Sequence, residues 1–380
     1  MKVPFVDLYA QYLGIKAEID SAIAEVIAQS AFIRGKHVDA FEQAWAGALK
    51  VKHSISCANG TDALYIAMRG LGLRPGDEVI TTAHSWIATS ETITQAGGRV
   101  VFCDTQEGTF NIDPCLIEAK ISKATVGIIP VDPSGQAADM DGIMAIAKKY
   151  NLWVIEDCAQ AHLATYKGRF VGTFGNAATF SFYPGKNLGA YGDAGCIVTN
   201  DDTLADWTAT FARHGGKGEH VMEGINSRMD GLQAAILNVK LPHLPAWTTA
   251  RRRVAARYNE LLNGIENLAT PKVGDDRNHV YHLYVVATDK RDSLKKTLAD
   301  SEITTSLNYP KALPFYPAYA YLGHKPTDFP AAYRNQSRII SLPIFPEMTD
   351  EMIEYVADQT RHALGDGSAV RSKMPKLAKV

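Results

Sequence analysis

The sequence contains 380 residues, of which 46% are hydrophobic and 21% are charged, with a formal net charge of −2. This length exceeds what one hydrophobic core commonly serves, so we expect two domains in an ordinary globular protein. The near-neutral charge argues against a nucleic-acid partner, and no apolar run approaches the roughly 20 residues that span a bilayer, so no membrane partner is expected.

The N-terminal residues, MKVPFVDLYAQY, lack the apolar core and the cleavage site of a signal peptide. The five cysteines are scattered along the chain and are never spaced C-x-x-C. This pattern indicates reduced thiols, with neither a disulfide framework nor a zinc site. It therefore predicts a cytoplasmic protein.

Short β-rich runs alternate with helix-like segments between about residues 50 and 200. Helical patterns occupy 61–72 and 138–150. The β-rich runs are nearly continuously apolar, as in strands covered on both faces, and they span 77–83, 99–104, 125–131, 152–157, 177–182 and 194–200. The alternation predicts an α/β domain with a mostly parallel sheet between helices, which we assign to residues 1–245.

The remainder of the chain predicts a second, smaller domain. Residues 229–265 are helical with a break near Pro242 and Pro245, a pattern that suits a connection between domains. Strands are expected at 279–289 and 303–309, with a helix between them. We assign an α+β domain to 246–365 and a disordered tail to the polar, basic residues 366–380.

Polar residues follow the predicted strands at the edge where open α/β sheets bind ligands. Glu156 and Asp157 end one strand, and Gln160 follows three residues later. A buried acid needs a partner, which favours a functional site. Helix capping by the aspartate, with an exposed glutamine, explains the same residues equally well.

The stretch FSFYPGKNLG places Ser181 near the end of the next strand and Lys186 five residues later. It is not a Walker phosphate loop, because Phe180 stands where the first glycine belongs and Asn187 replaces the serine or threonine. A lysine in a tight apolar turn can lose proton affinity and form a Schiff base. A lone loop lysine is otherwise a solvated surface charge.

Two further stretches could hold a cofactor. Asn59, Gly60 and Thr61 lie where a strand-like run gives way to a helix, and backbone N–H groups at a helix start suit a phosphate. Ordinary helix capping by Thr61 and Asp62 is the alternative. Trp86 follows another strand, where its ring could stack on a flat cofactor or simply belong to the core.

Taken together, a phosphate cradle, a flat ring, a carboxylate, a hydroxyl and a lysine match the needs of pyridoxal 5′-phosphate (PLP). That cofactor requires a lysine for its aldehyde and an acid facing its pyridinium nitrogen. A metal site is disfavoured, because the histidines lack ligand spacing such as H-x-x-x-H.

From VPFVDLYAQY through SLPIFPEMT, the chain resembles the DegT/DnrJ/EryC1/StrS family of PLP-dependent nucleotide-sugar aminotransferases. The motifs that carry the resemblance are NGTDAL, PGDEVI, IEDCAQAH, FSFYPGKNLGAYGDAG, GINSRMDGLQAAIL and VYHLYVV. The resemblance implies the type I aminotransferase fold, with a mostly parallel seven-stranded sheet in the large domain and a smaller C-terminal domain.

The resemblance also implies the roles of particular residues. Lys186 would form the Schiff base and move protons, and Asp157 would pair with the pyridinium nitrogen. The other implied cofactor contacts are Gln160 to the ring hydroxyl, Trp86 on the ring, Gly60, Thr61 and Ser181 to the phosphate, and Asn226 to the phosphate of a partner subunit. The site would then be complete only in a homodimer. Arg228, Asn308 and Tyr309 are candidates for substrate contacts.

The implied reaction moves an amino group from L-glutamate, which leaves as 2-oxoglutarate, to a keto group of a nucleotide-linked deoxy sugar. Such products serve surface-polysaccharide or glycoside biosynthesis. The chain departs from the common family pattern at Asp132-Pro133-Ser134, Leu163, Ala194 and Asn308, and we expect these positions to face the substrate.

Alternatives remain on the same scaffold. A sugar dehydratase would carry histidine at position 186, so Lys186 favours a transferase. Cyclitol or polyketide precursors are further possible substrates. A catalytically silent PLP-binding regulator is the alternative from a different functional class. The sequence does not distinguish the nucleotide, the sugar or amination at C-3 from amination at C-4.

Overall fold

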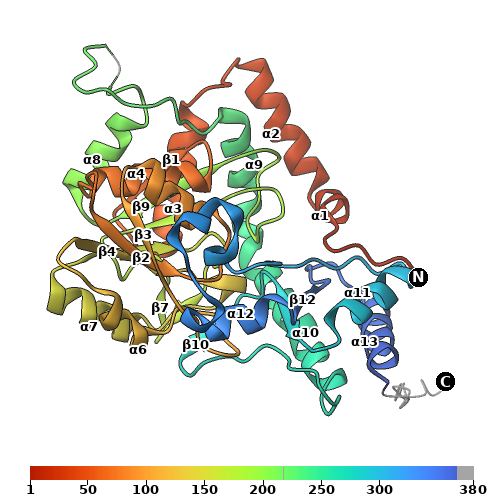
Figure 1. Cartoon of the computed structure of the whole chain (residues 1–380). Coiled ribbons are helices and arrows are strands. Elements are labelled where there is room, and N and C mark those ends of the chain that lie inside the picture. Colours follow the sequence, from red (N-terminus) through yellow and green to blue (C-terminus); the bar gives the residue numbers. More distant parts are fainter. Residues whose placement is uncertain (217, 366–380) are drawn as a thin grey trace.

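A computed structural model describes residues 1–216 and 218–365, so the tail predicted to be disordered lies outside the described residues (Figure 1). A seven-stranded sheet with the order β1-β9-β8-β5-β4-β2-β3 forms the centre of the large domain. Only β9 runs antiparallel to its neighbours in this sheet, which confirms the predicted, mostly parallel arrangement. In sheet order the strands are β1 (His53–Cys57), β9 (Gly195–Thr199), β8 (Ala177–Ser181), β5 (Trp153–Asp157), β4 (Thr125–Ile129), β2 (Glu78–Thr82) and β3 (Arg99–Cys103).

Helices cover both faces of this sheet, as the apolar strands require. Ala178 and Phe180 of β8 point into one core and Ala177 into the other, following the two-residue period of a strand. The first core is covered by α3 (Lys36–Leu49), α6 (Pro114–Ile117), α7 (Met140–Tyr150) and α9 (Gly231–Lys240). The second core is covered by α4 (Gly60–Gly70), α5 (Ala88–Gln95) and α8 (Asp202–Phe211). The N-terminal helices α1 (Leu8–Gly14) and α2 (Lys16–Ala28) add a small cluster beside α9.

A separate hydrophobic cluster forms the smaller C-terminal unit. Its elements are α10 (Leu244–Leu261), β11 (Tyr284–Ala287), α11 (Arg291–Asp300), β12 (Ile339–Leu342) and α13 (Asp350–Leu364). Val3 is buried in the same cluster, so the N-terminus lies beside this unit (Figure 1). The predicted break within 229–265 is a short 3₁₀ helix, η3 (Leu241–His243), between α9 and α10.

The strand predicted at 303–309 is wrong. Only Ile303 and Ser306 in this stretch form isolated β-bridges, and the partner of β11 is β12, which the sequence reading missed. A strand needs a continuous ladder of backbone hydrogen bonds to a neighbour. β12 forms that ladder with β11, which leaves residues 303–309 with isolated bridges only.

Residues 312–332 of the predicted small domain pack against the large one. Leu313, Tyr319 and Phe329 are buried in the core beneath α4 and α5, and the division at residue 245 stays a prediction. The elements here are η4 (Leu313–Phe315), η5 (Pro317–Leu322), η6 (Pro326–Asp328) and α12 (Pro330–Gln336). The remaining elements are η1 (Glu118–Lys120), η2 (Pro133–Gly135) and a three-stranded sheet of β10 (Arg277–Asn278), β6 (Thr165–Tyr166) and β7 (Arg169–Phe170).

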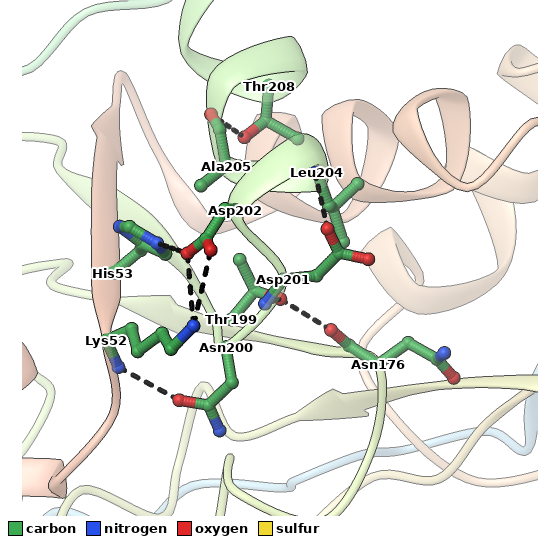
Figure 2. Close-up of polar contacts among 10 residues, drawn as sticks. All are labelled: Lys52, His53, Asn176, Thr199, Asn200, Asp201, Asp202, Leu204, Ala205 and Thr208. Atoms are coloured by element: carbon green, nitrogen blue, oxygen red, sulfur yellow. Dashed lines mark hydrogen bonds and ion pairs between the residues drawn. The ribbon is translucent and has the colours of Figure 1, made fainter.

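An exposed polar network lies on the side of the large sheet where β1 begins and β9 ends, which we call the amino edge. Figure 2 shows Asp202, in the first turn of α8, with its carboxylate 2.7 Å from His53 Nε2 and 3.3 Å from Lys52 Nζ. Asp201 caps the same helix by accepting a hydrogen bond from the Leu204 N–H at 3.0 Å. These contacts fix α8 at the edge opposite the candidate site.

No helix within residues 1–216 or 218–365 has both the length and the apolar character that a membrane crossing needs.

Candidate active site

A cavity of about 450 Å³ opens beyond the carboxyl ends of β1, β5 and β8. We call it the main cavity. All the predicted cofactor residues except Asn226 line it, namely Gly60, Thr61, Trp86, Asp157, Gln160, Ser181 and Lys186. Tyr309, one of the predicted substrate residues, also lines it. The sequence therefore located residues that the fold brings together, while their individual roles stay predictions.

Lys186 lies in the turn that follows β8, where its backbone N–H donates to the Tyr183 carbonyl at 2.8 Å. Removal of the amine from water lowers the pKa of Lys186 to about 8, and the negative charge of Asp157 opposes part of this effect. Lys186 is partly buried and lines the main cavity, which favours the functional interpretation over that of a solvated loop lysine. A larger share of this amine than of an ordinary lysine is unprotonated, and hence nucleophilic, near neutral pH.

Asp157 ends β5 and is 5% exposed. Its carboxylate accepts hydrogen bonds from Thr89 Oγ1 at 2.8 Å and from the Ala159 N–H at 3.2 Å. Burial raises the pKa of Asp157, whereas these two donors and the Lys186 charge act in the opposite direction. Sequence reasoning missed Thr89. Its position in the first turn of the helix after Trp86 was the available signal.

The adjacent Glu156 has a different task. Its carboxylate accepts hydrogen bonds at 2.8 Å from each of three backbone N–H groups, those of Gly172, Phe174 and Gly175. Because successive side chains of a strand face opposite sides, Glu156 secures a loop on one side while Asp157 faces the cavity. Neither acid is a helix cap, so the capping interpretation of this stretch is wrong.

Gln160 is held in place at both ends of its amide. Its Oε1 accepts from the Ser134 N–H at 2.6 Å, and its Nε2 donates to the Tyr309 hydroxyl at 2.8 Å. Tyr309 is also joined to His84, whose Nε2 lies 3.1 Å from the Tyr309 carbonyl oxygen. Residues distant in sequence thus hold Gln160 in one orientation.

Trp86 is 58% exposed, so the interpretation as a core tryptophan is wrong. Its ring centroid lies 5.5 Å from that of Tyr309, with an angle of 42° between the planes. The two rings come from different units of the chain and form part of the same cavity wall. A flat ligand would meet aromatic surface there.

The start of α4 forms an anion cradle. Asn59 caps the helix by accepting from the Asp62 N–H at 2.8 Å, and the first-turn amides at Gly60 and Thr61 lack intrahelical partners by geometry. A Cβ at Gly60 would lie 2.7 Å from the Ser181 Cβ, so glycine allows the helix start to approach that serine. Amides, a helix N-terminus and a hydroxyl thus converge where a phosphate can bind.

Two predicted residues are not part of this cavity. Asn226 is exposed and Arg228 is partly exposed, and neither lines the main cavity. Ser227 between them is buried and donates to Asp62 at 2.6 Å, which anchors the segment beneath the cradle. The segment therefore lies close to the site, but the side chains of Asn226 and Arg228 do not line the main cavity of this subunit.

Two of the departures from the family pattern are buried within the fold. Asp132 is 2% exposed and accepts from the Ala138 N–H at 2.8 Å, and Ala194 is buried in the core. Leu163 packs against the same core. The expectation that these positions face the substrate is wrong for Asp132 and Ala194, which are buried within the fold, and it stays a prediction for the partly exposed Leu163. Asn308 lines a second cavity, which is described below.

The donor set fits PLP on physical grounds. The cradle offers N–H and O–H groups to a phosphate, Trp86 and Tyr309 offer flat surfaces, and Asp157 and Lys186 share the same space. Asp157 acts on the Lys186 amine through charge and not through a hydrogen bond, so this amine remains available within the cavity. An α/β fold with this site defines a PLP-dependent enzyme.

The chain belongs to the DegT/DnrJ/EryC1/StrS aminotransferase family, whose pattern matches residues 14–361. It is 47% identical to the "Pleiotropic regulatory protein" of Geobacillus stearothermophilus, over 94% of this chain and 98% of that protein. It is 42% identical to the dTDP-3-amino-3,6-dideoxy-alpha-D-galactopyranose transaminase of Aneurinibacillus thermoaerophilus, with coverage of 94% and 98%. Its fold matches S. venezuelae DesV, solved in complex with a ketimine intermediate, with a TM-score of 0.93, 37% identity and coverage of 96% and 98%. The expected family, type I fold and PLP cofactor are confirmed.

Proposed function

We propose that this aminotransferase moves the amino group of L-glutamate to the C-3 keto group of a nucleotide-linked deoxy sugar. The observation that carries the proposal is the meeting of Lys186, Asp157 and the anion cradle in one cavity. The name of the A. thermoaerophilus relative, which specifies a 3-amino sugar, supports C-3 as the position aminated. The intact lysine supports a transferase over a dehydratase.

Lys186 is assigned two tasks, holding the cofactor covalently at rest and carrying a proton between two carbons during transfer. When bound, PLP supplies an electron sink and a temporary carrier for the amino group. An amine with a pKa near 8 can accept and return a proton near neutral pH, and its tether keeps it within reach of both carbons.

Asp157 is assigned to the cofactor's ring nitrogen, where a fixed negative charge favours protonation of that nitrogen. Thr89 orients the carboxylate through its 2.8 Å hydrogen bond. Gln160, itself fixed by Ser134 and Tyr309, is assigned to the ring hydroxyl. Thr89, Ser134 and Tyr309 thus hold both side chains in place before a ligand binds, which is the basis of preorganisation.

A homodimer with shared sites is the second part of the proposal. Asn226 lies outside the main cavity of its own subunit, as a residue that serves a partner's phosphate would. Large apolar side chains are exposed at Phe32, Ile33 and Tyr183, of which Tyr183 lines the main cavity. A bridge between Ile33 and Asp230 links the first two to the segment that holds Asn226. A second subunit that covers this surface would explain both features.

Hybrid dimers test the shared site. Asn226→Ala and Lys186→Ala subunits, mixed and refolded together, should regain activity, because one of the two hybrid sites would carry both wild-type residues. Native mass spectrometry would verify that hybrids form. Hybrids that form without any regained activity would contradict the shared site.

We also place the enzyme in the cytoplasm. All five cysteines are free thiols, and four of them are buried, which supports a reducing compartment.

The reaction itself is tested with a panel of dTDP- and UDP-linked 3-keto and 4-keto sugars, with L-glutamate as donor and products identified by mass spectrometry and NMR. We expect amination at C-3 and formation of 2-oxoglutarate. Amination only at C-4 would overturn the regiochemistry. A holoenzyme whose cofactor absorbance does not respond to glutamate or any other amino donor would instead support a silent regulator.

A further inference from the structure

A second cavity of about 260 Å³ adjoins the main one. Gln160, Tyr183, Lys186 and Tyr309 line both cavities, so these residues form the boundary between them. The other walls come from the N-terminal segment and the smaller C-terminal unit, through Phe5, Val6, Arg251, His282, Leu283, Asn308 and Ile344, with Gly185. We call it the Arg251 cavity.

Arg251 is held rigidly in this wall. It lies on α10, is 4% exposed, and its Nη1 donates to the carbonyl oxygens of Tyr281 at 3.2 Å and Ile344 at 2.9 Å. A longer contact of 3.4 Å reaches the His282 carbonyl. Among the described residues, Nε and Nη2 have no hydrogen-bond partner, which leaves one edge of the guanidinium available to a ligand.

The charge of Arg251 is not balanced by a paired acid. Among the described residues, Glu347 is the carboxylate that acts on it, through charge and without a hydrogen bond. Burial lowers the pKa of Arg251 to about 10, so the group stays charged at neutral pH. Burial also lowers the pKa of His282, which therefore adds no positive charge. A buried cation without a partner is costly, and a bound anion would relieve that cost.

We propose that the Arg251 cavity binds a carboxylate of the amino donor, with the free edge of Arg251 as the recognition group. Arginine suits this task, because its planar fork matches a carboxylate. The cavity is small for a nucleotide sugar but adequate for the carboxylate end of an amino acid. Lys186 lines both cavities, so a donor held here keeps its amino group near the reacting centre.

This inference rests on the proposed function and adds to it the residue that selects the donor. Its first test is calorimetric titration of the PLP-loaded enzyme with glutarate, a dicarboxylate that has no amino group to transfer. We expect Arg251→Gln to weaken glutarate binding by about 10–100-fold and to raise the KM of glutamate in parallel, while the KM of the keto sugar stays unchanged. Arg251→Lys, which keeps the charge but not the fork, should fall between.

Arg252→Gln is the matched control. Arg252 lies on the same helix and donates to the His279 carbonyl at 2.9 Å, but it does not line the cavity. Both glutamine variants should lose thermal stability, and only the Arg251 variant should lose glutarate binding. Equal glutarate affinity in the two variants would assign Arg251 a purely structural role and overturn the proposal.

A second variant covers the case in which loss of Arg251 prevents folding. Val6→Glu adds a carboxylate to the wall of the same cavity without removing any Arg251 contact to a carbonyl, and it should weaken glutarate binding by competing for the guanidinium or repelling the ligand. Unchanged affinity in this variant would count against the proposal.

L-Alanine distinguishes the two carboxylates of glutamate. If Arg251→Gln weakens L-alanine as a donor as strongly as glutamate, the site binds the α-carboxylate. If only glutamate is affected, the site binds the side chain. Wild-type enzyme that binds glutarate but does not transaminate glutamate would contradict the proposed function and leave the Arg251 site standing.

Discussion

The central sheet carries charged side chains in different environments at its amino edge, where β1 begins, and at its carboxyl edge, where the parallel strands end. At one edge, Asp202 meets Lys52 and His53 in solvent, and all three side chains are at least 36% exposed (Figure 2). At the other edge, Asp157 is buried and Lys186 is partly buried, and the two act on each other through charge without a direct ion pair. Hydrogen bonds from His53 and Lys52 lower the pKa of the exposed Asp202, whereas burial raises the pKa of Asp157 and lowers that of Lys186, shifts of the kind found at catalytic sites.

Lys240 is a second lysine with a lowered pKa, but its surroundings differ from those of Lys186. Removal from water also lowers the pKa of Lys240 to about 8. However, Lys240 donates to the Gly189 carbonyl at 2.7 Å, lies 4.3 Å from the centre of the Tyr191 ring, and lines neither of the two cavities described above. The Lys240 amine is already hydrogen-bonded within the fold, whereas Lys186 lines a cavity that can hold a ligand.

The largest expected effect comes from Lys186→Ala. Turnover should fall by about 10³-fold or more, because the nucleophile and the proton carrier are removed together, while the melting temperature changes little. Steady-state kinetics with glutamate and a keto sugar would measure the loss. Lys240→Met is the matched control and should lower stability while keeping most of the activity. Substantial transamination by Lys186→Ala would remove that residue from its role.

Asp157→Asn should have the next largest effect, a fall in kcat of about 10²-fold or more, because an amide lacks the charge that keeps the cofactor's ring nitrogen protonated. Thr89→Val, which removes one donor to that carboxylate, should have a smaller effect in the same direction. Stopped-flow absorbance of the glutamate half-reaction would rank the two variants. A near-normal rate in Asp157→Asn would exclude the assigned role.

Most of the large sheet and the main cavity could be predicted from the sequence, because buried parallel strands read as apolar runs and their carboxyl ends share one edge. Lys186, Asp157 and Gln160 stand at such ends. Arg251 could not be found this way. It belongs to a run of three arginines on one helix, and only tertiary packing distinguishes it from Arg252 and Arg253. Strand β12 was missed for the same reason, since its pairing with β11 is not local.

The pH dependence of cofactor capture tests whether Lys186, at the carboxyl edge, differs from an exposed lysine such as Lys52 at the amino edge. With a pKa of about 8, the Lys186 amine loses its proton as the pH rises through that value, and only the neutral amine attacks an aldehyde. The rate at which apoprotein captures PLP should rise about tenfold per pH unit below 8 and level off above it. Absorbance after mixing at a series of pH values would measure this. A rate that still rises steeply up to about pH 10 would mean that the lysine behaves as an ordinary surface group.

Asp202→Ala should have the smallest effect. Exposed ion pairs add little to stability and are screened by salt, so we expect a slight drop in melting temperature that disappears at high ionic strength. Activity and the pH profile of cofactor capture should match the wild type. A clear loss of activity would show that the two edges of the sheet are coupled.

The most direct test of the account is to find which lysine holds the cofactor. PLP-loaded enzyme is reduced with borohydride, digested and mapped by mass spectrometry. We predict a phosphopyridoxyl group on Lys186 and none on Lys240 or on exposed lysines such as Lys52. A label on any other lysine, with Lys186 unmodified, would contradict the central claim that the chemistry resides at the carboxyl edge of the sheet.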